Sequence, residues 1–359
     1  MKYRSALPQQ GSPATYPSRM GTWSIAARSS PRYCHPRSDK MSDFPKFVEF
    51  REEGPREGFQ IEKKIYPIEK RIELIDMLSE TGLKRIQVGS FVSPKYVPQM
   101  ADTGELFQRI KRKPGVNYTS LWLNDKGFRK ALTAHEVDID PRLLFYPSEA
   151  FAQSNNNCSS AEMREKQRDW VRLYKEEGYT VDAAYVMTAF GCNFEGPISQ
   201  ERILDDFRFI LALCEEEQIP VPILVVADTM GWGNPEAVKR MIGALRELAP
   251  DARIGMHIHD TRGLGIANLH AALSMGVDMF ESSVAGLGGC PFAGHGHARA
   301  AGNVCTEDAV FLCHELGIET GIDLDKLIAA ALKAEEIIEA PLMGRVMHTG
   351  GLDKYRKTS

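Results

Sequence analysis

Residues 222–260, PILVVADTMGWGNPEAVKRMIGALRELAPDARIGMHIHD, predict a strand, a helix and a second strand in direct succession. The first strand, PILVVAD, is short and rich in β-branched residues, as strands are. The helix has Asn234 in the N-cap position and Pro235 in its first turn, both frequent at a helix N-terminus. The second strand, RIGMHIH, follows it directly. A strand, a helix and a strand in this order form the repeating unit of α/β proteins.

The same alternation extends through the rest of the chain from Phe44 onward. A helix is predicted over residues 67–82, with Ile68, Ile72, Ile75 and Leu78 on one stripe. Eight strands with a helix after each are what a (β/α)8 TIM barrel requires, and this α/β fold is the one that we expect. A doubly wound open sheet is the alternative, but no GxGxxG motif follows the first strand. The six further strand segments are KFVEFREE, KRIQVGS, YTSLWL, RLLFYP, VDAAYVMT and VDMFESSV.

The first forty residues differ in composition from the rest of the chain. Residues 1–40 are rich in Ser, Pro and Arg and contain one acid, Asp39. We expect a disordered extension there, because such a segment cannot form a packed core. A transit peptide has this composition, but the prolines spoil an amphipathic helix, which favours a start at Met41. The expected domain is therefore a barrel over residues 41–359 in the cytoplasm, or in the mitochondrial matrix if the extension is a real transit peptide.

The charge balance and the cysteines exclude several classes of protein. The chain has 44 basic and 48 acidic residues and a net charge of −4, which gives no sign of a nucleic-acid partner. No apolar run approaches the roughly 20 residues of a membrane helix, so no membrane partner is expected. Seven cysteines without a CxxC motif argue for a reducing compartment, against a disulfide scaffold and against a zinc ribbon.

His257 and His259 lie at the end of the predicted strand RIGMHIH. Residues two apart on a strand point to the same face, so both imidazoles are expected to face one target. In a barrel the chemistry lies at the carboxyl ends of the strands and in the loops after them. The polar residues that follow the other strands include Arg56, Glu57, Gln60, Gln87, Ser90, Asp228 and Thr229.

Two histidines near acids favour a metal site over a structural role. The candidate partners are Glu57, Asp228 and Asn303, which would combine imidazole nitrogens with hard oxygen ligands. Such a set favours Mg²⁺ or Mn²⁺ over Zn²⁺ or Co²⁺. Cys290 lies in the glycine-rich stretch GLGGCPFAG, where a thiol near a cation gains reactivity.

Seven motifs follow one another in a fixed order: GPREGFQIEK, SFVSPKYVPQMAD, FGCNFEG, ADTMGWGNP, HIHDTRG, SSVAGLGGCPFAG and GNVCTED. In that order they resemble the 3-hydroxy-3-methylglutaryl-CoA lyase family of metal-dependent TIM-barrel lyases. The similarity extends from about Phe47 to about Leu327, nearly the whole barrel. GLGGCPFA followed by GN and TED is highly specific, whereas pyruvate-carboxyltransferase barrels also contain HxHDT. The related condensing synthases usually have HxHND at that position.

The resemblance implies a role for each matching residue. Arg56 would contact the substrate carbonyl and stabilise the enolate, and we also expect Asp228 and Thr229 to bind substrate. Cys290 would be catalytic, and His257 would take part in proton transfer. The expected partner is an acyl-CoA thioester, and we expect a homo-oligomer. The divalent-metal ligands implied are Glu57, His257, His259 and Asn303.

Three departures from the family pattern lie near this site. Glu57 stands where the family has aspartate, so its carboxylate is displaced by about one bond length. Gln87 stands where the lyases carry glutamate, so any help of that acid with proton transfer or with orienting Arg56 is lost or altered. The loop between Cys290 and Asn303 is longer than in the family and adds His295, His297 and Arg299.

The function expected from the resemblance is cleavage of a 3-hydroxy-3-methylglutaryl-CoA-like thioester to acetyl-CoA and a keto acid. One alternative is the same chemistry on another branched 3-hydroxyacyl-CoA. A second is a condensing transferase or carboxyltransferase, against which HDT in place of HND argues. The third is a non-catalytic binding barrel, motivated by Gln87; the retained arginine, ligand positions and loop cysteine argue against it.

Overall fold

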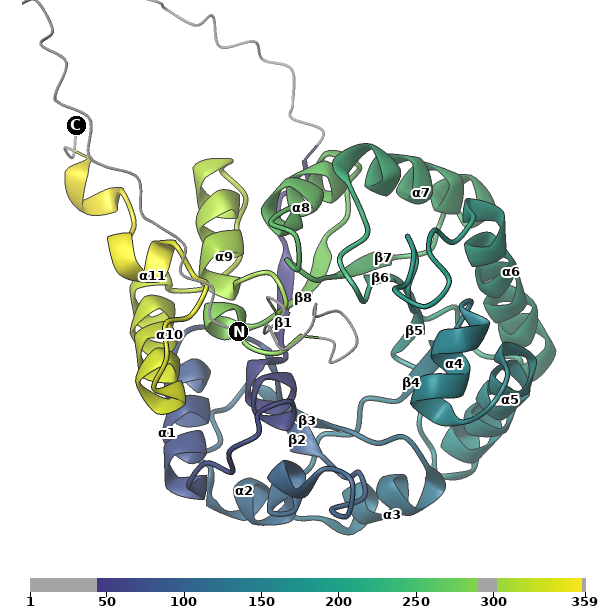
Figure 1. Cartoon of the computed structure of the whole chain (residues 1–359), viewed down its shortest axis with the longest axis horizontal. Coiled ribbons are helices and arrows are strands. Elements are labelled where there is room, and N and C mark those ends of the chain that lie inside the picture. The colour runs from purple at the N-terminus through teal and green to yellow at the C-terminus, as the bar shows by residue number, and fades with distance from the viewer. Residues whose placement is uncertain (1–43, 290–301, 357–359) are drawn as a thin grey trace, which may run out of the picture. The chain divides into compact units, whose positions relative to one another are not determined.

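The fold consists of eight strands in one sheet. Figure 1 shows that helices surround the strands. The computed structural model describes residues 44–289 and 302–356. The strands are β1 (Glu49–Glu52), β2 (Arg85–Ser90), β3 (Asn117–Leu121), β4 (Arg142–Phe145), β5 (Ala183–Val186), β6 (Ile223–Asp228), β7 (Ile254–Ile258) and β8 (Met279–Ser282).

All eight strands belong to one parallel sheet, in the hydrogen-bonded order β3-β2-β1-β8-β7-β6-β5-β4. β8 pairs with β1, so the first and last strands are neighbours, as a barrel requires. Asp138, just before β4, bridges the remaining gap to β3. Its N–H donates to the Tyr118 carbonyl (2.9 Å) and its carboxylate accepts from the Tyr118 N–H (2.6 Å). The expected TIM barrel is confirmed, and the open-sheet alternative is wrong.

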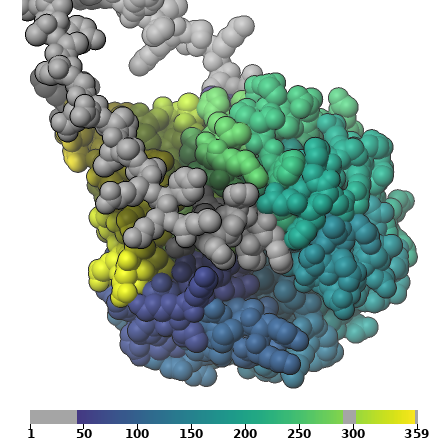
Figure 2. Space-filling model, in the orientation of Figure 1, coloured from purple at the N-terminus to yellow at the C-terminus, as the bar shows by residue number. Residues whose placement is uncertain are grey.

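Helices cover the outer face of the strands. In the space-filling view the colours follow the sequence around the rim, so that successive helices are neighbours on the surface (Figure 2). A π-helical turn, Gly54–Gly58, follows β1 at the barrel mouth. The helices are α1 (Ile68–Ser79), α2 (Thr103–Arg109), α3 (Asp125–Thr133), α4 (Glu149–Asn156), α5 (Ser160–Glu176), α6 (Gln200–Glu217), α7 (Pro235–Leu248), α8 (Gly265–Ser274), α9 (Thr306–Glu315), α10 (Leu324–Ile338) and α11 (Val346–Thr349).

Local sequence determines where several helices begin. The Asn234 side chain accepts from the Ala237 N–H (3.0 Å) and caps α7, as predicted. Ser159 and Glu162 form a capping box at the start of α5, in which each side chain bonds to the backbone of the other residue. Because the Asn234 cap fixes the start of α7, it also fixes the length of the loop after β6, at the end of the barrel where the site lies.

Charged side chains occupy the interior of the barrel. Arg51 of β1 contacts Asp182 before β5 at 2.6 Å, and Arg142 of β4 contacts Glu281 of β8 at 3.1 Å. The strands of each pair are not neighbours in the sheet, so both contacts cross the interior. Apolar side chains instead fill the layer between the strands and helices, including Leu74, Ile86, Phe207, Leu224 and Ile242.

Two further expectations from the sequence concern the N-terminal extension and membrane-spanning helices. The extension expected over residues 1–40 lies outside the described residues. In the described parts of the chain, no helix combines the length and hydrophobicity that a membrane span needs.

Candidate metal centre and active site

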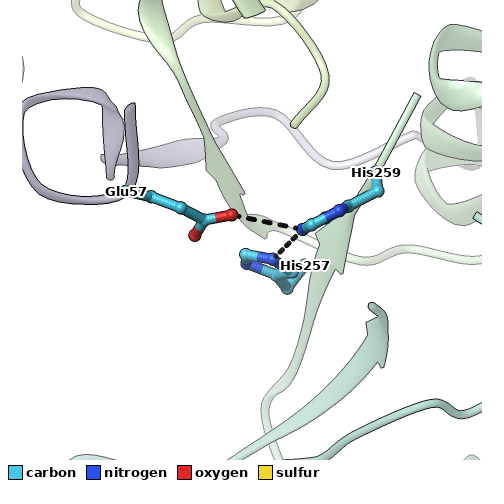
Figure 3. A group of neighbouring side chains, drawn as sticks. All are labelled: Glu57, His257 and His259. Atoms are coloured by element: carbon cyan, nitrogen blue, oxygen red, sulfur yellow. Dashed lines mark hydrogen bonds and ion pairs between the residues drawn. The ribbon is translucent and has the colours of Figure 1, made fainter. Parts of the chain in front are cut away.

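His257, His259 and Glu57 converge at the carboxyl end of β7 (Figure 3). The two histidines project from one face of the strand, and their Nε2 atoms are 2.8 Å apart. The Nε2 of His259 lies 3.4 Å from Oε1 of Glu57. All three residues are buried. The sequence spacing therefore predicted correctly that both imidazoles face one point, where a carboxylate joins them.

Glu57 reaches this point because β1 ends in the π-helical turn Gly54–Gly58. Pro55 lies in the first turn of this short helix, where its missing N–H costs nothing. The turn directs Arg56 and Glu57 into the barrel mouth together, with the Arg56 guanidinium 3.3 Å from the Glu57 carboxylate. We expected a loop there, and the helical turn is what places the two neighbours side by side.

Asn303 lies beside the same cluster. Its backbone forms a β-bridge with His259, and its Nδ2 donates to Ser283 Oγ at 2.9 Å. A Cβ added to Gly288 would lie 2.9 Å from Cγ of Glu57 and 3.3 Å from Nδ2 of Asn303, so both side chains flank this glycine. The Asn303 Oδ1 is buried and has no hydrogen-bond partner among the described residues.

The chemistry of this donor set fits a divalent cation. It offers two imidazole nitrogens, a carboxylate oxygen and an amide oxygen that is otherwise unpaired. Unpaired buried polar atoms are rare in proteins, and a cation would satisfy the Asn303 oxygen. The outer nitrogen of His257, Nδ1, is 2.8 Å from Glu281 Oε2, the support that metal-binding histidines commonly have.

Charges in the cluster shift the pKa values of its members. Burial alone would raise the pKa of Glu57, but Arg56 and the two histidines lower it well below the usual range. Burial alone would lower the pKa of His257, but the hydrogen bond to Glu281 raises it above its ordinary value. Glu57 is therefore charged at neutral pH, and a bound cation would compete with a proton for His257.

A pocket of about 200 Å³ opens beside the cluster. Thr229 lines it together with Arg56 and the cluster, so the predicted substrate contact of Thr229 is sterically feasible. Asp228 is different, because its two oxygens accept from the backbone N–H groups of Trp232 (2.8 Å) and Gly233 (3.0 Å). Asp228 thus holds the β6–α7 loop. The apolar part of the wall consists of Ile61, Leu121, Leu123, Leu144, Tyr146, Phe151 and Met187.

Gln87 keeps contact with Arg56 although it is neutral. Its Oε1 accepts from Nε of Arg56, while Nη2 of Arg56 donates to Glu53. Glu53 follows β1 and is 1% exposed, so this ion pair is shielded from solvent. Arg56 therefore has a carboxylate partner in Glu53, the residue after β1. The family pattern instead places an acid at the position of Gln87, on β2.

Cys290, His295, His297 and Arg299 lie outside the described residues. The described chain stops one residue before Cys290, at Gly289, whose N–H donates to Glu57 Oε1 at 3.3 Å. Gly288 and Gly289 have φ values of 93° and 123°, which side chains other than glycine rarely allow. Glycine at both positions lets the backbone approach the Glu57 carboxylate.

Sequence analysis did not identify four residues that support the site. They belong to the barrel interior: Glu53, Tyr185 and Glu281 are buried, and the Arg142 side chain is 9% exposed. The signal for Glu281 was its position: it is the one charged residue in the short strand β8, and in the structure it pairs with His257 across β7 and β8. A buried charge in such a strand needs a partner, and His257 is that partner.

Together the fold and the site define a TIM-barrel protein with a candidate divalent-metal centre at the carboxyl ends of its strands. Known proteins are similar to this chain in sequence and in fold. The HMGL-like family model matches residues 48–333. The mitochondrial hydroxymethylglutaryl-CoA lyase of Bos taurus is 40% identical over 294 residues, covering 82% of this chain and 86% of that protein.

Two further relatives agree with this assignment. The cytoplasmic 3-hydroxy-3-methylglutaryl-CoA lyase of Homo sapiens is 36% identical over 309 residues, covering 86% of this chain and 80% of that protein. An HMG-CoA lyase from Acinetobacter baumannii, solved with coenzyme A and 3-methylmalate, has a TM-score of 0.76 and 34% identity over 89% of this chain and 99% of that one. The chain belongs to the HMGL-like family, and the resemblance seen in its motifs is confirmed.

Proposed function

We propose that this protein is a divalent-metal-dependent lyase that cleaves 3-hydroxy-3-methylglutaryl-CoA to acetyl-CoA and acetoacetate. One observation carries the proposal: Glu57, His257 and His259 converge beside Arg56 at a pocket in a chain of this family, and Asn303 forms a β-bridge with His259. The relatives named above are themselves called HMG-CoA lyases, and one was solved with coenzyme A bound.

The metal ligands in this proposal are Glu57, His257, His259 and Asn303. Their nitrogen and hard oxygen donors favour Mg²⁺ or Mn²⁺. When bound, the cation would supply Lewis-acid polarisation of substrate oxygens.

The reaction requires a proton acceptor and a stabiliser of negative charge. The 3-hydroxyl loses its proton, the C2–C3 bond breaks, C3 becomes the ketone of acetoacetate, and the electron pair passes to the thioester as an enolate. His257 is suited to take the hydroxyl proton when its Nε2 is not coordinated, because the Glu281 carboxylate at Nδ1 then stabilises the imidazolium. The Arg56 guanidinium, held by Gln87 and Glu53, would stabilise the enolate oxygen as an oxyanion-hole donor does.

The remaining assignments follow from the pocket and the motifs. Thr229 faces the substrate pocket, and Asp228 would act on substrate through the loop that it holds. We assign to Cys290 the proton that converts the enolate at C2 into acetyl-CoA, which is the role that the motif GLGGCPFA implies.

The decisive experiment incubates purified protein with Mg²⁺ or Mn²⁺ and a panel of 3-hydroxy-3-methyl-acyl-CoA thioesters, and follows acetyl-CoA release. Turnover of 3-hydroxy-3-methylglutaryl-CoA supports the proposal. If another branched thioester is preferred, the substrate of the proposed lyase is that thioester. Metal-dependent acyl or carboxyl transfer without cleavage would indicate a transferase. If metal binds and no thioester is turned over, the protein is a binding barrel and the proposal is wrong.

The compartment and the assembly remain predictions. The relatives named above include a mitochondrial and a cytoplasmic form. We infer a cytoplasmic protein, because the prolines of residues 1–40 oppose the amphipathic helix of a transit peptide. Light scattering of the purified protein would test the predicted homo-oligomer.

A further inference from the structure

Arg142, at the start of β4, contacts three carboxylates inside the barrel. Its Nε and Nη2 donate to Asp140 Oδ2 at 3.1 and 2.8 Å. Its Nη1 and Nη2 donate to Glu53 Oε1 at 3.2 and 3.3 Å, and Nη1 also contacts Glu281 Oε1 at 3.1 Å. These five contacts equal the number of N–H donors of a guanidinium. Arg142 therefore keeps no donor for a substrate, although it lines the pocket.

Glu53 connects Arg142 to Arg56. Oε1 of Glu53 accepts from Arg142, and Oε2 accepts from Arg56. Burial and the nearby Glu281 raise the pKa of Glu53, and the two arginines oppose that rise. Without Arg142, Glu53 would lose one of the two cations that keep it charged, and Arg56 would lose its oriented partner.

Glu281 connects Arg142 to His257. Oε1 of Glu281 accepts from Arg142 and from the Tyr185 hydroxyl (2.5 Å), and Oε2 lies 2.8 Å from Nδ1 of His257. The carboxylate holds the proton on Nδ1, so the lone pair of Nε2 is directed toward the candidate metal centre. Arg142 thus anchors the carboxylate that orients a metal ligand.

We propose that Arg142 is a positioning residue, which orients Arg56 through Glu53 and His257 through Glu281. The inference rests on the proposed function, because it takes Arg56 and His257 as the groups that act on substrate. The planar fork is essential to it: one guanidinium reaches both carboxylates at once, and the single nitrogen of a lysine does not have this geometry. Four segments of the barrel, β1, β4, β7 and β8, are connected to the site in this way.

The test compares Arg142→Met and Arg142→Lys with a matched control, Arg85→Met. Arg85 is also a partly buried barrel arginine and contacts Asp140 (3.2 Å) and Asp182 (2.8 Å), but not Glu53 or Glu281 in the described structure. Each metal-free variant is titrated with Mn²⁺ by calorimetry, and kcat and KM are then measured with the thioester that the wild type cleaves. Circular dichroism and the melting temperature report folding.

In Arg142→Met we expect the Mn²⁺ affinity to fall about 10- to 100-fold, as when other outer-shell partners are removed, and kcat to fall about 100-fold. KM should change less than about threefold, since Arg142 has no free donor for substrate. Arg142→Lys should recover the melting temperature but not kcat. Arg85→Met should retain affinity and kcat within about threefold. Wild-type Mn²⁺ affinity and kcat in folded Arg142→Met would overturn the proposal.

Two further measurements keep the test decisive. If Arg142→Met does not fold, Glu53→Gln breaks only the branch to Arg56: kcat should fall at least about tenfold with Mn²⁺ affinity retained, and an unchanged kcat refutes the branch. If the wild type cleaves no thioester, the proposed function fails. The Mn²⁺ titration of Arg142→Met, or of Arg142→Lys if only that variant folds, then still decides whether Arg142 positions His257.

Discussion

Gly302→Ala is the substitution for which the structure gives the sharpest expectation. A Cβ at this position would lie 2.4, 2.6 and 2.7 Å from the carbonyl oxygens of Gly286, Leu287 and Gly288. These atoms belong to the backbone, so no side-chain rotation relieves the overlap. Residues 286–288 would have to withdraw by roughly 1 Å to regain ordinary contact distances.

That withdrawal would reach the metal centre. Gly288 packs against Glu57, and the Gly289 N–H donates to Glu57 Oε1. Gly302 itself is fixed, because its carbonyl accepts from the Asp260 N–H at 2.9 Å beside His259. A shift of about 1 Å at a catalytic group costs about 100-fold in rate, and overpacking a core costs about 1–3 kcal/mol of stability.

The assay measures kcat/KM, Mn²⁺ affinity and the free energy of unfolding in urea. We expect kcat/KM to fall about 100-fold and Mn²⁺ affinity at least about tenfold, with a loss of about 1–3 kcal/mol in stability. Gly104→Ala in α2 is the control, because a Cβ there meets no atom within 4 Å. It should leave catalysis unchanged and stabilise the fold by about 0.5–1 kcal/mol. Wild-type catalysis in Gly302→Ala would refute the reasoning.

Four further predictions test single residues. His259→Ala should lower Mn²⁺ affinity more than about 100-fold while the barrel stays folded, and unchanged metal content would contradict its role as a ligand. Arg56→Lys should lower kcat about 100-fold with little change in KM or metal affinity, whereas equal effects would assign Arg56 to ground-state binding. Cys290→Ser should lower turnover by orders of magnitude, because a hydroxyl is a far weaker acid than a thiol; a wild-type rate would exclude it as proton donor. Burial raises the pKa of Glu307 to about 8, so its ionisation costs stability as pH rises from about 4.5 to 8. The free energy of unfolding of Glu307→Gln, measured in urea, should therefore rise relative to that of the wild type by about 2 kcal/mol as the pH is raised from 6 to 9. Parallel pH profiles of the two proteins would contradict this.

The barrel was predictable because its signal is local and repeated. Each of the eight strand segments found in the sequence overlaps a strand of the structure, and Asn234 caps α7 as expected. Strand ends were less predictable. KFVEFREE, for example, contains β1, but only Glu49–Glu52 forms the strand, because the chain then turns into the π-helical turn Gly54–Gly58. The apolar pattern alone does not specify where that turn begins.

The core of the site was predictable for a geometric reason. The i, i+2 spacing of His257 and His259 places both on one face of a strand, and parallel strands of a barrel end at one rim. That reasoning also brought Glu57 to the site. The contact between Asn303 and this cluster depends on a bridge to His259, 44 residues earlier in the chain, which no local sequence pattern specifies.

The charge pairs inside the barrel were not predicted from the sequence, and the surroundings of Gln87 show why. The sequence presents the change from an acid to Gln87 as a loss near Arg56. In three dimensions Glu53 supplies a carboxylate to Arg56, and Arg142, 89 residues later, neutralises Glu53 in turn. A buried charge is tolerated only with a partner, and here the partners come from the end of β1 and from β4, which are not neighbours in the sheet. No local pattern contains that pairing, so a substitution that weakens a site in the sequence can be compensated by charges that only the closed barrel brings together.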